Sequence, residues 1–292
     1  MESRSFGNTI KYFLDLSKLK IMIPVSLTGF TGFFIFEPHI SCKIILVSFG
    51  ILLLGISASV LNQIQEVDLD SKMNRTHDRP LPARKIKLQH ALLFFLFNLI
   101  AGTVLIYRAG NLTAALLGLV TVSWYNGIYT YVKRITAFAV VPGAVTGALP
   151  PLIGWVAAGG GVWDKSIIFV EFLFFIGQVP HFWLLILKYG EEYENAGIPS
   201  MTSILSRHQI NRLTFTWVVT SVIAALFLCH FEIIQTRLNV GILLMASLIM
   251  IWQFFDLVII QANKNNYKKY SFLLDSYFLL ILLLLISDRI MA

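Results

Sequence analysis

The segment LNQIQEVDLDSKMNRTHDRPLP, residues 61–82, places acidic side chains directly before basic ones. Asn62, Glu66 and Asp70 are four residues apart, so on a continuous helix they share one face, with neighbouring side chains about 5–6 Å apart. Neighbouring carboxylates repel each other unless a cation lies between them, and proteins usually hold Mg2+ with one or two carboxylates plus substrate phosphates. Asp68 points away on an ideal helix, where it is either a ligand in an unwound segment or solvated. The spacing predicts a Mg2+ site.

Two arginines follow the acidic residues. Arg75 and Arg79 precede Pro80, which ends any helix. Arginine binds phosphate oxygens through a planar, bidentate fork of N–H groups. Carboxylates for a metal followed by arginines for phosphate predict a site for a diphosphate, whereas the basic residues at 84–87 are better explained as a solvated loop.

A second polar set lies at residues 177–201. Gln178 and His181 interrupt an apolar run, and polar groups at that depth in a membrane normally face a cavity or another helix. His181 is interpreted as an acceptor-substrate contact, a proton-transfer group or a partner of a neighbouring helix. Beyond the run, Lys188 is predicted to contact phosphate, Glu192 to be a second metal ligand, and Tyr193 to contact substrate.

Lys133 and Arg134 lie between the two polar sets, at the start of another apolar segment. They are either anchors that orient the chain in a membrane or groups that reach the diphosphate from the side. Residues 142–154 are rich in Gly and Pro, and small residues in membrane helices usually allow close helix packing.

Nine apolar segments must position these residues. Of the 292 residues, 57% are hydrophobic and 13% are charged, compared with about 25% charged in soluble domains. A helix needs about 20 apolar residues to cross a bilayer, and backbone groups in lipid must be bonded internally. The chain is therefore predicted to be an all-α, polytopic membrane protein with nine spans, near 21–37, 44–61, 89–107, 111–131, 136–158, 166–187, 213–230, 238–262 and 271–288.

The distribution of Lys and Arg predicts the orientation. With the N-terminal segment 1–20 in the cytoplasm, most of the 23 basic residues fall on the cytoplasmic side, as the positive-inside rule requires. The polar caps at 62–88 and 188–212 then lie on that same face. The net charge of +7 is explained by topology, so no nucleic-acid partner is expected. Residues 1–292 are interpreted as one domain.

At these residues the sequence resembles the UbiA-type intramembrane prenyltransferases, and within them the protoheme IX farnesyltransferases, or heme O synthases. The acidic pattern of Asn62, Glu66 and Asp70 carries the first resemblance. The stretches DLDSKMNRTHDRPLP, YTYVKRIT with ALPPLIGW, and QVPHFWLLILKYGEEYENAGIPSM carry the second. Glu66 and Glu192 stand where that family has Asp, and Ala137 and Ala139 stand where many members have Pro and Asn.

The resemblance implies a nine-helix fold around a central, lipid-open cavity. The predicted location is the cell inner (cytoplasmic) membrane. It implies farnesyl diphosphate as donor, heme B as acceptor, Mg2+ as cofactor, and heme O as a product for a downstream heme A synthase. Asn62, Glu66, Asp70 and Glu192 would hold the metal, while Arg75, Arg79, Lys133 and Lys188 would neutralise the diphosphate. Four aromatic residues are predicted to line the space and stabilise an allylic cation: Tyr125, Tyr129, Phe182 and Trp183.

Two other functions fit parts of the pattern. One is a prenyltransferase that acts on a quinone precursor or another lipid acceptor. The other is a transporter whose polar groups form an ion path, although a transporter gives no reason for acids and arginines to gather at two caps on one face.

Overall fold

The computed structural model describes residues 2–259 and 264–291, and every regular element within them is helical. The helices are α1 (Glu2–Ser17), α2 (Leu19–Phe36), α3 (Cys42–Gln65), α4 (Val67–Asp70), α5 (Leu88–Ala109), α6 (Leu112–Ser123), the π-helix η1 (Trp124–Tyr129), α7 (Thr130–Val132), α8 (Val140–Ala157), α9 (Lys165–Asn195), α10 (Met201–Ile204), α11 (Arg207–His230), α12 (Arg237–Ile259) and α13 (Lys264–Met291).

Nine stretches of helix in the described part of the chain are long and apolar enough to cross a membrane, which confirms the predicted count. They are α2, α3, α5, the continuous run Leu112–Val132, α8, α9, α11, α12 and Asn266–Met291. Large apolar side chains such as Leu93, Phe97 and Trp252 point outward and are mostly exposed, as lipid-facing residues must be. The chain is an integral, multi-pass membrane protein.

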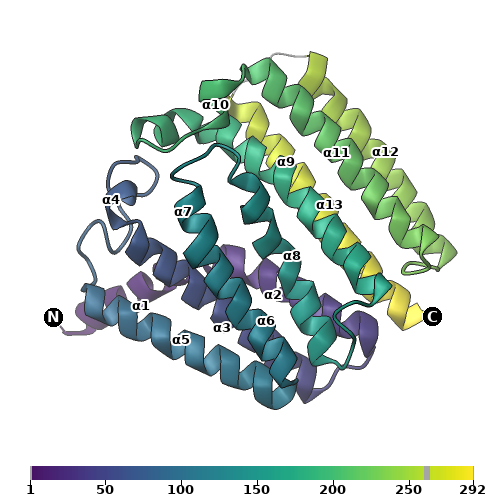
Figure 1. Ribbon diagram of the computed structural model, residues 1–292, viewed down its shortest axis with the longest axis horizontal. Helices are drawn as coiled ribbons and strands as arrows, with labels where there is room; N and C mark the ends of the chain where they lie inside the picture. Colours follow the sequence, from purple (N-terminus) through teal and green to yellow (C-terminus); the bar gives the residue numbers. More distant parts are fainter. Residues whose placement is uncertain (1, 260–263, 292) are drawn as a thin grey trace.

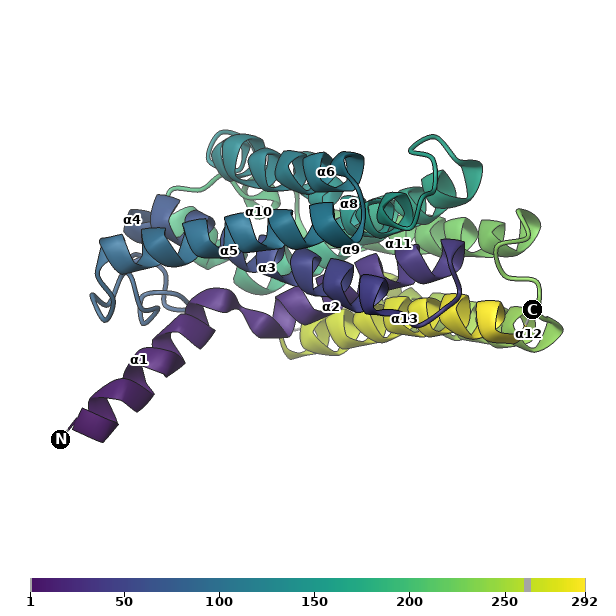
Figure 2. The same ribbon diagram turned by 90° about the horizontal axis from the view of Figure 1, so that it is seen from below.

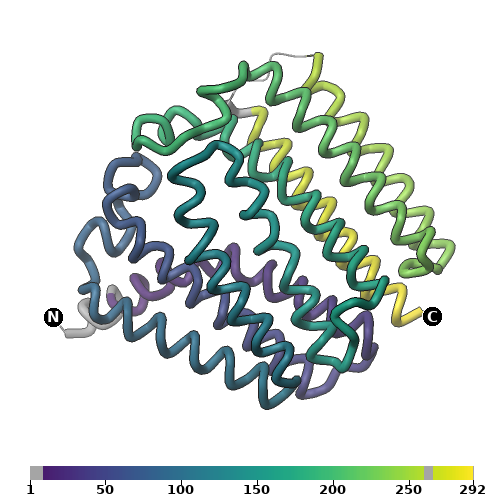
Figure 3. Tube along the Cα trace, in the orientation of Figure 1, coloured from purple at the N-terminus to yellow at the C-terminus, as the bar shows by residue number. Residues whose placement is uncertain are grey.

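The spans form a ring in chain order (Figures 1 and 3). Each span contacts the next one along the chain, and α13 contacts α2, which closes the ring. Helix α2 also packs across the ring against α8, and α13 packs against α9. Helix α1 projects away from the bundle (Figure 2).

Close contact between α2 and α8 depends on small residues. A methyl group added to Gly32 would overlap the Pro151 carbonyl, and one added to Gly154 would overlap the carbonyl of Gly29. The small residues of segment 142–154 therefore include packing positions, as the sequence indicated.

Two spans differ from the prediction at the ends that carry polar residues. The fourth span changes from α-helix to π-helix at Trp124, and α9 continues to Asn195 rather than ending near 187. Lys188, Glu192 and Tyr193 therefore lie on the last turns of a helix instead of in a loop. Short helix α4, the loop after it, the end of α9 and α10 lie at the same end of the molecule (Figure 1).

Candidate active site

The end of α3 positions the acidic residues. The α-helix stops at Gln65, Glu66 takes a non-helical backbone conformation (φ −115°, ψ 14°), and the short helix α4 follows at once. Asn62, Glu66 and Asp70 are all buried, whereas Asp68 is exposed. The predicted shared face thus persists through an interruption of one residue, and Asp68 lies outside it.

Asp70 is paired with Arg79. The Nη1 of Arg79 lies 2.8 Å and 2.7 Å from the two carboxylate oxygens. The Asp70 side chain is 2% exposed and the Arg79 side chain 25%. Thr76 Oγ1 donates a hydrogen bond of 2.9 Å to the Asp70 backbone carbonyl, which folds the loop back over the acid.

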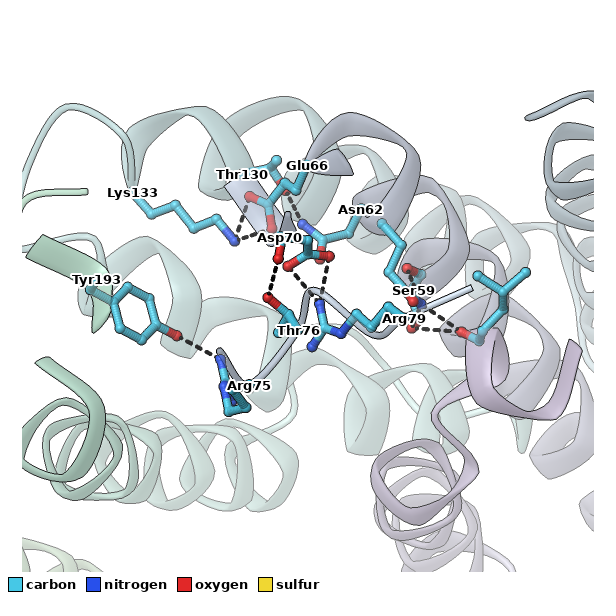
Figure 4. Close-up of polar contacts among 12 residues, drawn as sticks. Ser59, Asn62, Glu66, Asp70, Arg75, Thr76, Arg79, Thr130, Lys133 and Tyr193 are labelled. Atoms are coloured by element: carbon cyan, nitrogen blue, oxygen red, sulfur yellow. Dashed lines mark hydrogen bonds and ion pairs between the residues drawn. The ribbon is translucent and has the colours of Figure 1, made fainter. Parts of the chain in front are cut away.

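Glu66 is paired with Lys133 across the bundle (Figure 4). The Nζ of Lys133 lies 2.6 Å from Oε1 and 2.7 Å from Oε2 of Glu66. Oε1 is buried, and its contact with Lys133 lacks hydrogen-bond geometry. The same ammonium lies 5.4 Å from the centre of the Tyr129 ring, within cation–π range.

Arg75 joins the two polar caps. Its backbone N–H donates to Glu192 Oε2 at 3.2 Å, and its guanidinium donates to the Tyr193 hydroxyl at 3.3 Å. The guanidinium also lies over the Tyr189 ring, 5.0 Å from its centre. The loop after α4 and the end of α9 therefore form one polar layer over the acidic residues, the polar roof.

The π-helix η1 packs against the end of α3 and forms another wall of the site. Thr130 Oγ1 donates to the Tyr125 carbonyl five residues earlier, and Asn62 Nδ2 donates to Thr130 Oγ1 at 3.2 Å. Gln65 Nε2 donates to the Asn126 carbonyl at 3.1 Å. These contacts hold η1 against the end of α3, and π-helical turns are frequent at functional sites.

A small pocket adjoins the paired charges. Its polar lining includes Tyr129, Lys133 and Tyr193. Phe182 and the buried Ala137 and Ala139 contribute to its apolar lining. The Tyr129 and Phe182 rings meet edge to face at 6.1 Å. Three of the predicted aromatic lining residues therefore lie together, since Tyr125 stacks on Tyr129 at 5.3 Å.

Other predicted site residues have different surroundings. Arg134 donates to the Gln65 carbonyl at 2.7 Å and so satisfies a carbonyl at the end of α3. The Trp183 ring packs on Trp217 of α11 at 5.9 Å, and the structure does not bring it to the acidic cluster. Its predicted contact with substrate stays a prediction.

The remaining predicted residues lie along α9. Lys188 Nζ lies 4.7 Å from the centre of the Tyr189 ring. Gln178 packs so closely on α8 that a methyl group on Gly147 would come within 2.7 Å of its side-chain carbon. His181 Nδ1 lies 3.0 Å from Asp275 Oδ1 on α13.

Sequence reasoning missed Lys18, at the junction of α1 and α2. Lys18 has left-handed backbone angles (φ 45°, ψ 45°), and the preceding Leu16 carbonyl accepts hydrogen bonds from Ser59 and Gln63 of α3. Burial, followed by the charge of Arg79, lowers the pKa of Lys18 to about 7. No short motif marks this residue, because its neighbours come from a distant part of the chain.

The donor atoms fit a hard divalent cation once substrate oxygens are added. The described residues hold no group of three or more His, Cys, Asp or Glu side chains that could bind a metal alone. However, Glu66 Oε1 is a buried carboxylate oxygen without a hydrogen bond, and Mg2+ characteristically combines one or two carboxylates with phosphate oxygens. The protein therefore offers part of a coordination shell, of the kind that substrate phosphate oxygens complete around Mg2+.

Comparison with known proteins identifies relatives over most of the chain. The model of the UbiA prenyltransferase family matches residues 25–281. A protoheme IX farnesyltransferase of Nitratidesulfovibrio vulgaris strain DP4 is 34% identical over 233 residues, 80% of each chain. One of Geobacter sulfurreducens is 45% identical over 154 residues, 52% of this chain and 56% of the relative.

Solved structures share the fold. A digeranylgeranylglyceryl phosphate synthase superposes with a TM-score of 0.77 at 22% identity, covering 97% of this chain and 99% of that one. A UbiA homologue from Archaeoglobus fulgidus bound to DMAPP and Mg2+ superposes with a TM-score of 0.67 at 15% identity, covering 92% and 98%.

Proposed function

Because the chain belongs to the UbiA prenyltransferase family and is therefore a prenyltransferase, we propose that it transfers a farnesyl group from farnesyl diphosphate to a vinyl group of heme B. The products are heme O and diphosphate. The observation that carries the proposal is the buried set of two carboxylates, each facing a cation, beneath a roof that joins both polar caps. The name shared by the bacterial relatives supports farnesyl as the donor group and heme as the acceptor.

The donor diphosphate binds where acids and bases now neutralise each other. Arg79 and Lys133 exchange their carboxylate partners for diphosphate oxygens, and Arg75 and Lys188 approach from the roof. The carboxylates that they release are then free to hold Mg2+, for which we propose the ligands Asn62, Glu66, Asp70 and Glu192. When bound, the ion supplies positive charge that stabilises the departing diphosphate.

Ionisation breaks the C1–O bond of the donor, and the electron pair leaves with diphosphate. Fixed positive charge at the position where negative charge develops is the kind of stabilisation that dominates such reactions. The allylic cation left behind must be kept from water. Tyr129, Tyr125 and Phe182 meet beside the charged cluster and offer ring faces to it.

The vinyl group of the porphyrin then donates its π electrons to C1 of the cation. Water adds to the resulting cationic carbon, and the proton that this water loses passes to diphosphate or solvent. This gives the hydroxyethylfarnesyl side chain of heme O. Gln178 and Tyr193 are further substrate contacts in this proposal, and a heme A synthase is the expected consumer of the product.

The orientation is also proposed. Residues 1–292 act as one domain in the inner membrane, with segment 1–20 and both caps on the cytoplasmic side. The bias of Lys and Arg toward that side supports this orientation.

The direct test is incubation of the purified protein with heme B, farnesyl diphosphate and Mg2+, followed by chromatography and mass measurement of the porphyrin. We expect hydroxyethylfarnesyl heme, which EDTA and the Asp70→Asn variant abolish. Asp68→Asn is the matched control, because this acid is exposed two residues away and its loss should leave activity unchanged. Prenylation of quinone precursors but never of heme would refute heme as acceptor; solute movement without any product would favour a transporter.

A further inference from the structure

A histidine and an aspartate meet between two membrane-spanning helices. His181 lies on α9 and Asp275 on α13, and 3.0 Å separate Nδ1 of the ring from Oδ1 of the carboxylate. Both residues lie within candidate spans. Ionisable groups at that depth are costly and usually face a pathway or a substrate.

His181 lies on the side of α9 that faces the polar roof. On an ideal helix His181, Lys188 and Glu192 lie within about 40° of one another, and Glu192 accepts the backbone N–H of Arg75. The neighbouring Phe182 meets Tyr129 beside the charged cluster. His181 is eleven residues before Glu192, about 16 Å along the axis, a separation comparable to the width of a porphyrin.

The contact between α9 and α13 holds Asp275 in position. Gly177 lies one turn before His181, and a methyl group there would overlap the Phe278 ring, one turn after Asp275. The Phe174 and Phe278 rings lie 5.8 Å apart along the same contact. Beside this close packing, the side chains of His181 and Asp275 stay 43% and 59% exposed.

With Nδ1 of His181 beside the carboxylate, the other ring nitrogen is left to bind a ligand. Nδ1 faces the carboxylate at 3.0 Å, so Nε2 is the ring nitrogen that points away from the pair. Histidines that bind metals nearly always donate their other ring nitrogen to a carboxylate, carbonyl or water, and a proximal histidine is the common protein ligand of heme iron.

We propose that Nε2 of His181 is the axial ligand of the iron of the heme substrate, and that Asp275 is the positioning residue that orients this ring. The proposal rests on heme as the acceptor. Ligation of the iron fixes the porphyrin at its centre, so one edge with its vinyl group extends toward the diphosphate site. The carboxylate also makes the imidazole a stronger electron donor, which stabilises ferric over ferrous heme.

The test is spectroscopic titration of ferric heme B into the purified protein in lipid nanodiscs. The wild type should give a saturable Soret band of histidine-ligated heme, and His181→Ala should lose it. His208→Ala is the matched control, because it removes an exposed imidazole at the start of α11. Added imidazole should restore the band to His181→Ala, which also demonstrates that the variant is folded.

Two variants test the role of Asp275. Asp275→Ala should lower heme affinity by about 10- to 100-fold, as loss of such an orienting partner usually does. Asp275→Asn keeps a hydrogen-bond acceptor but removes the charge, so it should retain binding and raise the reduction potential of the bound heme. If both variants change only thermal stability, the pair is a structural link between α9 and α13, and the positioning role is wrong.

The outcomes separate this site from the catalytic proposal. If wild type forms heme O while His181→Ala keeps the wild-type heme spectrum, iron ligation by His181 is refuted and farnesyl transfer stands. If the spectrum depends on His181 but no farnesylated heme forms under any condition, the iron site stands and the proposed reaction fails.

Discussion

Replacement of Arg79 by Ala should destabilise the protein in a way that Mg2+ repairs. The variant leaves the Asp70 carboxylate buried at 2% exposure without its partner. Loss of one member of a buried pair costs about 3–5 kcal/mol, and we expect about 3, the low end, because Arg79 itself is 25% exposed. A cation at 100 times its dissociation constant adds about 2.7 kcal/mol, so Mg2+ should recover most of the loss.

The assay is reversible unfolding in mixed detergent micelles, with and without Mg2+, for the wild type, Arg79→Ala, Asp70→Asn and the double variant. Mg2+ should stabilise Arg79→Ala more than the wild type, since it replaces the missing guanidinium. The double variant should be more stable than Arg79→Ala, because Asn carries no charge. Equal stability of Arg79→Ala and the double variant, together with no added response to Mg2+, would show that the reasoning about this buried charge is wrong.

Three further outcomes follow from other parts of the structure. The pKa of Lys18, lowered to about 7 by burial and then by Arg79, leaves its amine mostly neutral at pH 8. An anionic diphosphate favours the protonated form of this amine, so farnesyl diphosphate affinity should fall as pH rises above 7. Calorimetry in buffers of different ionisation enthalpy should detect the uptake of about one proton on binding. This uptake should be absent in Lys18→Met. Ala139→Phe fills the small pocket beside Tyr129 and should raise the KM for heme B without changing farnesyl diphosphate affinity. The control Ala139→Ser should leave the KM for heme B nearly unchanged. Asp288→Ala removes acceptors for two backbone amides at the start of α12 and for Asn239; unfolding should show a loss of about 2 kcal/mol, while activity per folded molecule is unchanged.

The spans and the acidic face were predictable because they depend on local sequence. Apolar length determines which segments can cross a bilayer, and the four-residue spacing of Asn62, Glu66 and Asp70 persists even though the helix is interrupted at Glu66. The burial of these three residues beside an exposed Asp68 agrees with the helical spacing. The assignment of these residues as metal ligands stays a prediction.

Features that depend on contacts between distant segments were not predictable. The π-helix that begins at Trp124 is held by Gln65 of another span, and Asp275 looks like an isolated acid in an apolar run until α13 packs against α9. Trp183 illustrates the reverse case. It was predicted to line the substrate space, and in the structure its ring contacts Trp217 of α11, because neighbouring residues on a helix face different partners.

The pairing of Glu66 with Lys133 bears on how the protein is made. Asp70, at the end of α4, pairs with Arg79 only nine residues later, whereas Glu66 and Lys133 are 67 residues apart. At about 5–20 residues per second, a ribosome needs about 3–13 s to synthesise the segment between them. During that interval two more spans must emerge, so Glu66 reaches the membrane boundary before its counter-ion exists. The ion pair between the second and fourth spans can form only after the fourth has been made, so this wall of the site assembles after the pairing of Asp70 with Arg79 has become possible.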